Sequence, residues 1–235
     1  MATAADAKTT KVNAGRRNLM IGAGAVALAA VGGIAYFAAN RGDDAAGARR
    51  PAGPISAAEL MAAGPLAEQA QGAANAPVTI VEYASMTCPH CAHFHLTTFP
   101  ELKKRYIDSG QVRFIFREFP LDPLATGAFM LARCAGDDRY FALLDLLFHE
   151  QRQWAVNNPL PPLLNVVKQA GFTQESFNAC LANGQLREGV EKTGQRGADR
   201  FGVRSTPTFF INGNVVRGSF EVEDLDKVID PYLKG

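Results

Sequence analysis

Residues 78–91 read Val-Thr-Ile-Val-Glu-Tyr-Ala-Ser-Met-Thr-Cys-Pro-His-Cys, and this stretch decides the fold. Its first seven residues are mostly apolar and rich in β-branched and aromatic side chains, a pattern typical of a buried strand. Cys88 and Cys91 follow, and apolar positions then recur at helical spacing to about residue 108, with Pro100 as an expected kink. The sequence therefore predicts a strand, a Cys-x-x-Cys pair and a helix, in that order.

This order places Cys88 at the N-terminus of a helix, where free backbone N–H groups and the helix dipole favour a thiolate. Cys91 lies in the first turn, close enough to form a disulfide with Cys88. Pro89 suits the first helical position, and His90 adds positive or hydrogen-bonding character beside the Cys88 sulfur. Because a stabilised thiolate makes the disulfide a stronger oxidant, the four residues indicate a redox pair that donates disulfides.

The rest of the chain continues as strands and helices. Residues 112–119 are almost continuously apolar, which fits a strand covered on both faces. Two short apolar runs at 208–211 and 215–217 flank Asn212-Gly213, a strong hairpin signal, and 224–233 is an amphipathic helix. Between these strands the pattern predicts only helices, at 124–134, 140–154, 160–170, 175–182 and 186–201.

A second motif, Thr206-Pro207, stands directly before the strand at 208–211, where a fold can retain a cis peptide bond. With this motif and this order of elements, the chain resembles the DsbA-like family of thioredoxin-fold proteins. The resemblance runs from about Gly72 to the C-terminus, and residues 75–83, 88–91, 119–121 and 206–213 carry it. It implies an α/β thioredoxin fold with a helical insertion at about residues 122–202.

The resemblance also implies roles for individual residues. Cys88 would be the exposed nucleophile and Cys91 the buried resolving thiol. Pro207 would be a cis-proline facing the disulfide, with the backbone of Thr206 pairing with an extended substrate segment. Glu82 matches a buried acid that moves protons to and from the resolving cysteine, although a lone Glu in a strand usually faces solvent. The expected catalytic residues are thus Glu82, Cys88, Pro89, His90, Cys91, Thr206 and Pro207.

Other charged and metal-binding side chains lie near this motif. Arg113 or Arg117, on the next predicted strand, is a candidate ionic partner for Glu82, but the register cannot be read from the sequence. The Cys pair could instead be half of a zinc site with His93 or His95, or a copper site with His95. A strand–helix junction is the setting of redox cysteines. We therefore expect no metal and no cofactor, with both histidines as surface or packing residues.

The two remaining cysteines, Cys134 and Cys180, fall in separate predicted helices of the insertion. In an oxidising compartment, two unpaired cysteines near one core tend to pair. We expect a structural disulfide between them, and two buried free thiols are the alternative.

The N-terminal region has a different composition. Residues 19–39 are apolar and uncharged and follow Lys8, Lys11, Arg16 and Arg17, as in an export signal or a membrane anchor. Cleavage and retention of this segment remain equally open. We therefore expect three regions: a signal or anchor at 1–40, a linker at 41–70 with a short helix within 55–70, and a folded domain at 71–235.

Charge and composition limit the possible partners. The chain has 235 residues, 47% of them hydrophobic, which is enough for one packed domain and a tail. Its 24 basic and 23 acidic residues give no field that would favour nucleic acid. The resemblance implies periplasmic action on reduced or misfolded secreted proteins, with reoxidation by a membrane quinone-linked (DsbB-like) oxidase.

Two other functions remain open. The first is a disulfide isomerase or reductase, because the residue at the position of Thr206 varies with activity in the family; residues 55–70 would then serve as an oligomerisation segment. The second is a non-catalytic copper or zinc chaperone.

Overall fold

A five-stranded mixed sheet forms the centre of the structure, a computed structural model that describes residues 55–234. The strands are β1 (Gln69–Gln71), β2 (Val78–Ala84), β3 (Val112–Glu118), β4 (Thr208–Ile211) and β5 (Asn214–Arg217), in the spatial order β1-β3-β2-β4-β5. Only β2 and β3 run parallel. The central strand β2 is covered on both faces, which explains its nearly continuous apolar sequence.

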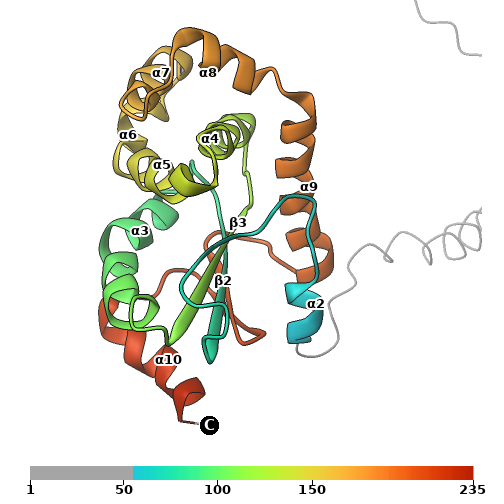
Figure 1. Ribbon diagram of the computed structural model, residues 1–235, viewed down its shortest axis with the longest axis vertical. Helices are drawn as coiled ribbons and strands as arrows, with labels where there is room; N and C mark the ends of the chain where they lie inside the picture. Colours follow the sequence, from blue (N-terminus) through green and yellow to red (C-terminus); the bar gives the residue numbers. More distant parts are fainter. Residues whose placement is uncertain (1–54, 235) are drawn as a thin grey trace, which may run out of the picture. The chain divides into compact units, whose positions relative to one another are not determined.

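Helices cover both faces of the sheet (Figure 1). One face carries α3 (Pro89–Leu102), which continues as a π-helical turn (Lys103–Ile107), together with α10 (Leu225–Leu233). The other face carries α9 (Gly184–Phe201) and the short α2 (Ala57–Met61). Because α3 starts where β2 ends, the Cys pair lies at one end of the central strand.

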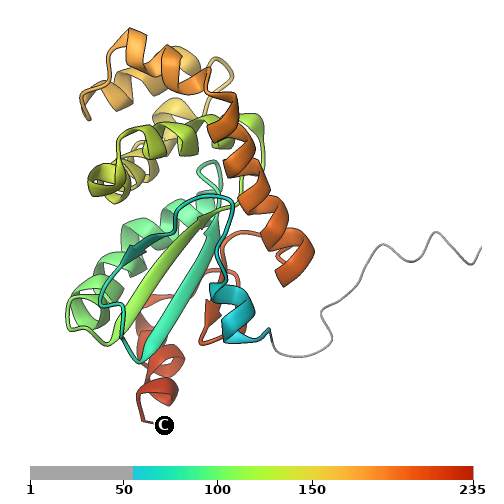
Figure 2. The ribbon, with the colours of Figure 1, turned by 45° about the vertical axis from the view of Figure 1, so that its right-hand side comes forward.

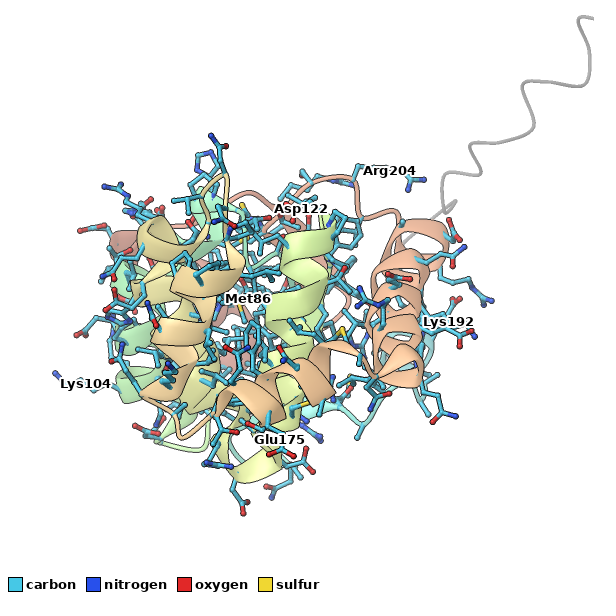
Figure 3. All side chains as sticks on the ribbon, turned by 90° about the horizontal axis from the view of Figure 1, so that it is seen from above. Met86, Lys104, Asp122, Glu175, Lys192 and Arg204 are labelled. Atoms are coloured by element: carbon cyan, nitrogen blue, oxygen red, sulfur yellow. A yellow bond between two sulfur atoms is a disulfide. The ribbon has the colours of Figure 1, made fainter. Side chains whose placement is uncertain are left out.

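The predicted insertion is a layer of helices at that same end of the sheet (Figure 2). It contains α4 (Pro123–Cys134), α5 (Asp137–His149), α6 (Gln151–Trp154), α7 (Leu160–Lys168) and α8 (Gln174–Leu181). Seen from above, Met86 lies in the middle of the domain, whereas Glu175, Lys192 and Arg204 lie toward its edges (Figure 3). A disulfide joins Cys134 at the end of α4 to Cys180 in α8, with their Cα atoms 6.2 Å apart.

The contact between α9 and the sheet depends on a glycine. A Cβ atom at Gly197 would lie 2.6 Å from the ring carbon Cε1 of Tyr83 on β2, closer than any ordinary contact. A Cβ atom at Gly184, at the other end of α9, would have no neighbouring atom within 4 Å. The absence of a side chain at 197 therefore lets the helix approach the tyrosine ring.

The N-terminal part of the described chain differs from the prediction. The linker was expected to reach residue 70, but β1 pairs antiparallel with β3 from residue 69. The helix α2 also contacts the domain, because Arg117 Nη2 donates to the Leu60 carbonyl at 2.7 Å. The strand β1 has the polar sequence Gln-Ala-Gln, which shows no hydrophobic alternation. Pairing with the backbone of β3 determines its conformation.

The helix expected at 140–154 is also two helices, since the backbone of Glu150, at φ −94° and ψ 10°, separates α5 from α6. The signal or anchor expected at 1–40 lies outside the described residues. Within residues 55–234, no helix combines the length and the apolar character needed to cross a membrane.

Candidate active site

Cys88 caps the N-terminus of α3. Its backbone is extended, at φ −81° and ψ 119°, and its Sγ accepts the Cys91 backbone N–H at 3.4 Å. Pro89 occupies the first turn, and Pro89 and His90 are both exposed at the surface of the site. The two thiols are not bonded to each other. The structure therefore shows the site in its reduced, dithiol form.

The loop before β4 completes the site. The Thr206–Pro207 peptide bond is cis, and Cys88 in its thiol form donates to the Thr206 carbonyl at 3.4 Å. The antiparallel pairing of β2 with β4 brings these residues together, although 118 positions separate them in the sequence. Among the described atoms, the buried hydroxyl Oγ1 of Thr206 has no hydrogen-bond partner.

The accessibility of Cys88 differs from what the resemblance implied. Only 5% of the residue is exposed, because the sulfur lies between the start of α3 and the Thr206 backbone. Cys91 is fully buried, as expected for a resolving thiol. The order of accessibility thus agrees with the expected roles, but Cys88 itself is largely buried rather than exposed.

The two thiols have opposite acidities. The pKa of Cys88 is lowered from 9.0 to about 5, first by a hydrogen bond from the Cys91 thiol and also by the backbone N–H groups of Cys91 and His90, which together outweigh the opposing effect of burial. Burial raises the pKa of Cys91 well above its usual range, and its hydrogen bond to Cys88 and the charge of Glu82 act in the same direction. At neutral pH, Cys88 is therefore a thiolate and Cys91 a thiol.

Glu82 lies behind this pair and is fully buried. Its Oε2 is 2.8 Å from Nε2 of His95, which is itself only 3% exposed. The expectation of an ionic partner at Arg113 or Arg117 is therefore wrong: both arginines bind Glu68, at 3.3 Å and 3.0 Å.

The sheet register explains this error. Arg113 lies opposite Thr79 and Arg117 opposite Tyr83, so both arginines share a face with odd-numbered residues of β2. Glu82 points to the other face, because successive side chains in a strand alternate. Glu82 lies on the face of the sheet that α3 covers, and the side chain of α3 that meets it is His95.

The structure also places the two histidines of α3 differently from each other. His93 is exposed and lies 3.3 Å from Glu221, whereas His95 stacks on Phe148 of α5 with ring centroids 4.4 Å apart. His95 is four residues after Cys91, so both lie on the same face of the helix. The spacing of four residues between Cys91 and His95 is the sequence feature that could have placed His95 near the Cys pair.

Gln151 of α6 also belongs to the site, although the sequence did not predict it. Its buried Nε2 donates to the carbonyls of Met86 and Cys88, at 2.8 Å and 3.0 Å. These carbonyls belong to the loop between β2 and α3, so the insertion holds the backbone that carries Cys88. A glutamine in a helical segment gives no sequence signal for such a long-range contact.

Metal-binding geometry is not found at the Cys pair. Across residues 55–234, no three or more His, Cys, Asp or Glu side chains gather in a way that could hold a metal ion. The histidines that the zinc and copper hypotheses would use are each paired with a glutamate.

A mixed sheet with a Cys-x-x-Cys pair at the start of a helix, facing a cis-proline, defines a thioredoxin-fold protein. The family model Thioredoxin_4, described as thioredoxin, matches residues 66–231. The chain belongs to this family and resembles its DsbA-like thiol:disulfide oxidoreductases.

Individual relatives agree with this assignment. A Rickettsia conorii protein named as a protein-disulfide oxidoreductase is 36% identical over 159 residues, which cover 67% of this chain and 57% of that protein. The match thus spans little more than half the length of that relative. A Bacillus anthracis protein named as disulfide bond formation protein D is 30% identical over 177 residues, covering 71% of this chain and 79% of that protein.

Solved structures agree as well. The crystal structure of Wolbachia pipientis alpha-DsbA1 superposes with a TM-score of 0.67 at 28% identity, covering 76% of this chain and 98% of that one. Oxidised BdbD from Bacillus subtilis gives a TM-score of 0.64 at 24% identity, with 72% and 94% covered, and supports the fold. These likenesses confirm the predicted thioredoxin fold with helical insertion.

Proposed function

We propose that this chain is an extracytoplasmic disulfide oxidase that passes the Cys88–Cys91 disulfide to reduced or misfolded secreted proteins. The position of Cys88 at the N-terminus of α3, where its sulfur accepts the Cys91 N–H, is the observation that carries the proposal, because it gives the two thiols opposite acidities. A Cys88 pKa of about 5 stabilises the reduced form of the pair at neutral pH, so the disulfide readily gives up its oxidising equivalents.

The proposed reaction is thiol–disulfide exchange. A substrate thiolate attacks the Cys88 Sγ, the Cys88–Cys91 bond breaks, and its electron pair goes to Cys91. A second substrate thiolate then attacks the substrate sulfur of the mixed disulfide, and Cys88 leaves as a stable thiolate. Exposed Pro89 and His90 and the backbone of Thr206 beside Pro207 form the surface that a substrate segment meets.

Reoxidation needs a second partner. We propose a membrane quinone-linked, DsbB-like oxidase whose disulfide accepts the electron pair from Cys88 and Cys91. The apolar residues 19–39, in which no charge interrupts 21 positions, support export or tethering to the inner membrane. Fractionation of cells that make the full chain, with protease added to spheroplasts, tests this location.

The activity is tested by oxidation of a reduced model protein with the purified full chain. The wild type should form disulfides in the substrate, and Cys88→Ser should abolish turnover because it removes the attacked sulfur. His93→Gln, an exposed change on the same helix, is the control and should retain the rate. Turnover that survives in Cys88→Ser rejects the proposal.

An isomerase is less well supported. The segment that would serve for oligomerisation is bound to its own domain through β1 and through hydrogen bonds from Arg117 and Arg196 to carbonyls of residues 59–62. Refolding of a scrambled disulfide substrate, together with the molecular mass in solution, distinguishes the two functions. A monomer that oxidises thiols but fails to rearrange wrong disulfides agrees with the oxidase.

A further inference from the structure

His95 and Glu82 form a polar pair inside an otherwise apolar core. Their side chains are 1% and 0% exposed, and 2.8 Å separates Nε2 from Oε2. Five phenylalanine rings surround the imidazole, with centroids between 4.4 Å and 6.4 Å away: Phe94, Phe99, Phe114, Phe116 and Phe148. Burying such a pair is expensive unless its hydrogen bonds are made, so its place behind Cys91 calls for an explanation.

Two atoms of the pair have no hydrogen-bond partner among residues 55–234: Oε1 of Glu82 and Nδ1 of His95. A buried N–H without an acceptor is costlier than a buried lone pair without a donor. The arrangement therefore favours a proton on Nε2 that is donated to Glu82. The Glu82 carboxyl group is then held in one orientation, and Oε1 is its free atom.

The free oxygen belongs to a carboxyl group that acts on Cys91. The charge of Glu82 contributes to the raised pKa of the Cys91 thiol, and Cys91 and His95 lie one helical turn apart. Oε1 makes no hydrogen bond within residues 55–234, so it is the carboxyl oxygen left free to exchange a proton.

Two ionisable residues of α5, Tyr140 and Asp145, interact with the pair. Tyr140 interacts electrostatically with Glu82, but burial raises its pKa far above neutrality, so it stays a neutral phenol. Asp145 interacts with His95, and burial raises its pKa. The residues opposite Glu82 in the sheet are Phe116 on β3 and Phe209 on β4, which do not titrate. Asp145 is thus the neighbour to control for.

We propose that His95 is a positioning residue that orients Glu82 so that Oε1 exchanges a proton with the Cys91 sulfur in each redox cycle. This proposal rests on the proposed function. When a substrate thiolate opens the disulfide, Cys91 takes the released electron pair and a proton from the Glu82 carboxyl group. Glu82 becomes a carboxylate that His95 Nε2–H continues to bind. When a partner disulfide reoxidises the pair, Cys91 loses its electron pair to the new S–S bond and returns the proton to Glu82.

The test is the rate at which dithiothreitol reduces the oxidised full chain, followed by the fluorescence of Trp154 over a range of pH. Each variant is compared with the wild type at the same pH, so that ionisation of the reductant cancels. Glu82→Gln should slow reduction by roughly a hundredfold, the lower end of what a positioned acid contributes. His95→Leu should slow it about tenfold and change the pH dependence, because the carboxyl group loses its orientation.

Three further variants separate positioning from mere packing. His95→Gln keeps an N–H donor and should recover part of the rate, while His93→Gln should match the wild type. Asp145→Asn shows the contribution of that carboxyl group to the pH profile. If His95→Leu leaves both rate and profile unchanged, or slows reduction equally at every pH, the proposal is overturned.

A measurement on the wild type covers variants that fail to fold. Nitrogen-15 NMR of the reduced protein should show the His95 proton on Nε2, and a proton on Nδ1 would refute the proposed geometry. Oxidation of a model substrate by the same wild-type sample is measured in parallel. If the wild type oxidises the substrate but the His95 variants are reduced at the wild-type rate, the positioning role alone is rejected. If the wild type does not oxidise the substrate, the proposed function is rejected.

Discussion

The lowered pKa of Cys88 should make the stability of the reduced protein depend on pH. A thiol whose pKa falls from 9.0 in the unfolded chain to about 5 in the fold stabilises the fold at every pH above the folded value, and the contribution grows until the unfolded chain ionises as well. The contribution is complete above 9.0 and is lost as the pH falls through 5. At pH 7, about two pH units above the folded value, it amounts to about 3 kcal/mol.

The assay compares the reduced wild type with reduced Cys88→Ser, which cannot ionise at this position. Urea unfolding is measured between about pH 4 and pH 8 with a phosphine reductant, so that Cys134 and Cys180 are reduced in both proteins and their effect cancels. The wild-type advantage should shrink by about 3 kcal/mol from pH 7 to pH 4. An advantage that stays constant over this range would refute the argument, as would a thiolate absorbance titration with a midpoint near 9.

Three further predictions follow from contacts outside the redox pair. Replacing both Cys134 and Cys180 by alanine should lower the free energy of unfolding by about 3 to 4 kcal/mol, given a sequence separation of 46, and an unchanged unfolding midpoint would contradict this. Gln151→Leu should leave two carbonyls of the active-site loop unpaired and slow oxidation of a model protein several-fold; a rate equal to that of the wild type would show that the loop holds its shape alone. Gly197→Ala should destabilise the fold by about 1 to 3 kcal/mol by thermal unfolding, whereas Gly184→Ala, which meets no neighbour, should not.

Local sequence pattern was sufficient for the elements that surround the Cys pair. The apolar run of residues 78–84 and the helical spacing of apolar residues after Cys91 indicate a buried strand and a half-buried helix. The structure has β2 at Val78–Ala84 and α3 from Pro89. The hairpin at Asn212-Gly213 was equally readable, because Asn212 adopts a positive φ of 46° that few residues tolerate.

Long-range pairing could not be read in the same way. The strand β1 is polar, and pairing with β3 determines its conformation. The partner of Glu82 depends on the strand register, because a shift of one residue would move every side chain to the other face of the sheet. The role of Gln151 depends on how the insertion docks. Each of these features joins residues that only the folded chain brings together.

The helical insertion contributes no reacting atom, yet it contacts the redox centre, through Phe148 on His95 and through Gln151 on the Cys88 carbonyl. Evolution can therefore retune the centre by substitutions in α5 and α6 while the Cys-Pro-His-Cys sequence stays the same. Relatives with identical active-site motifs can then differ in oxidising strength, and a comparison limited to the motif would miss the cause.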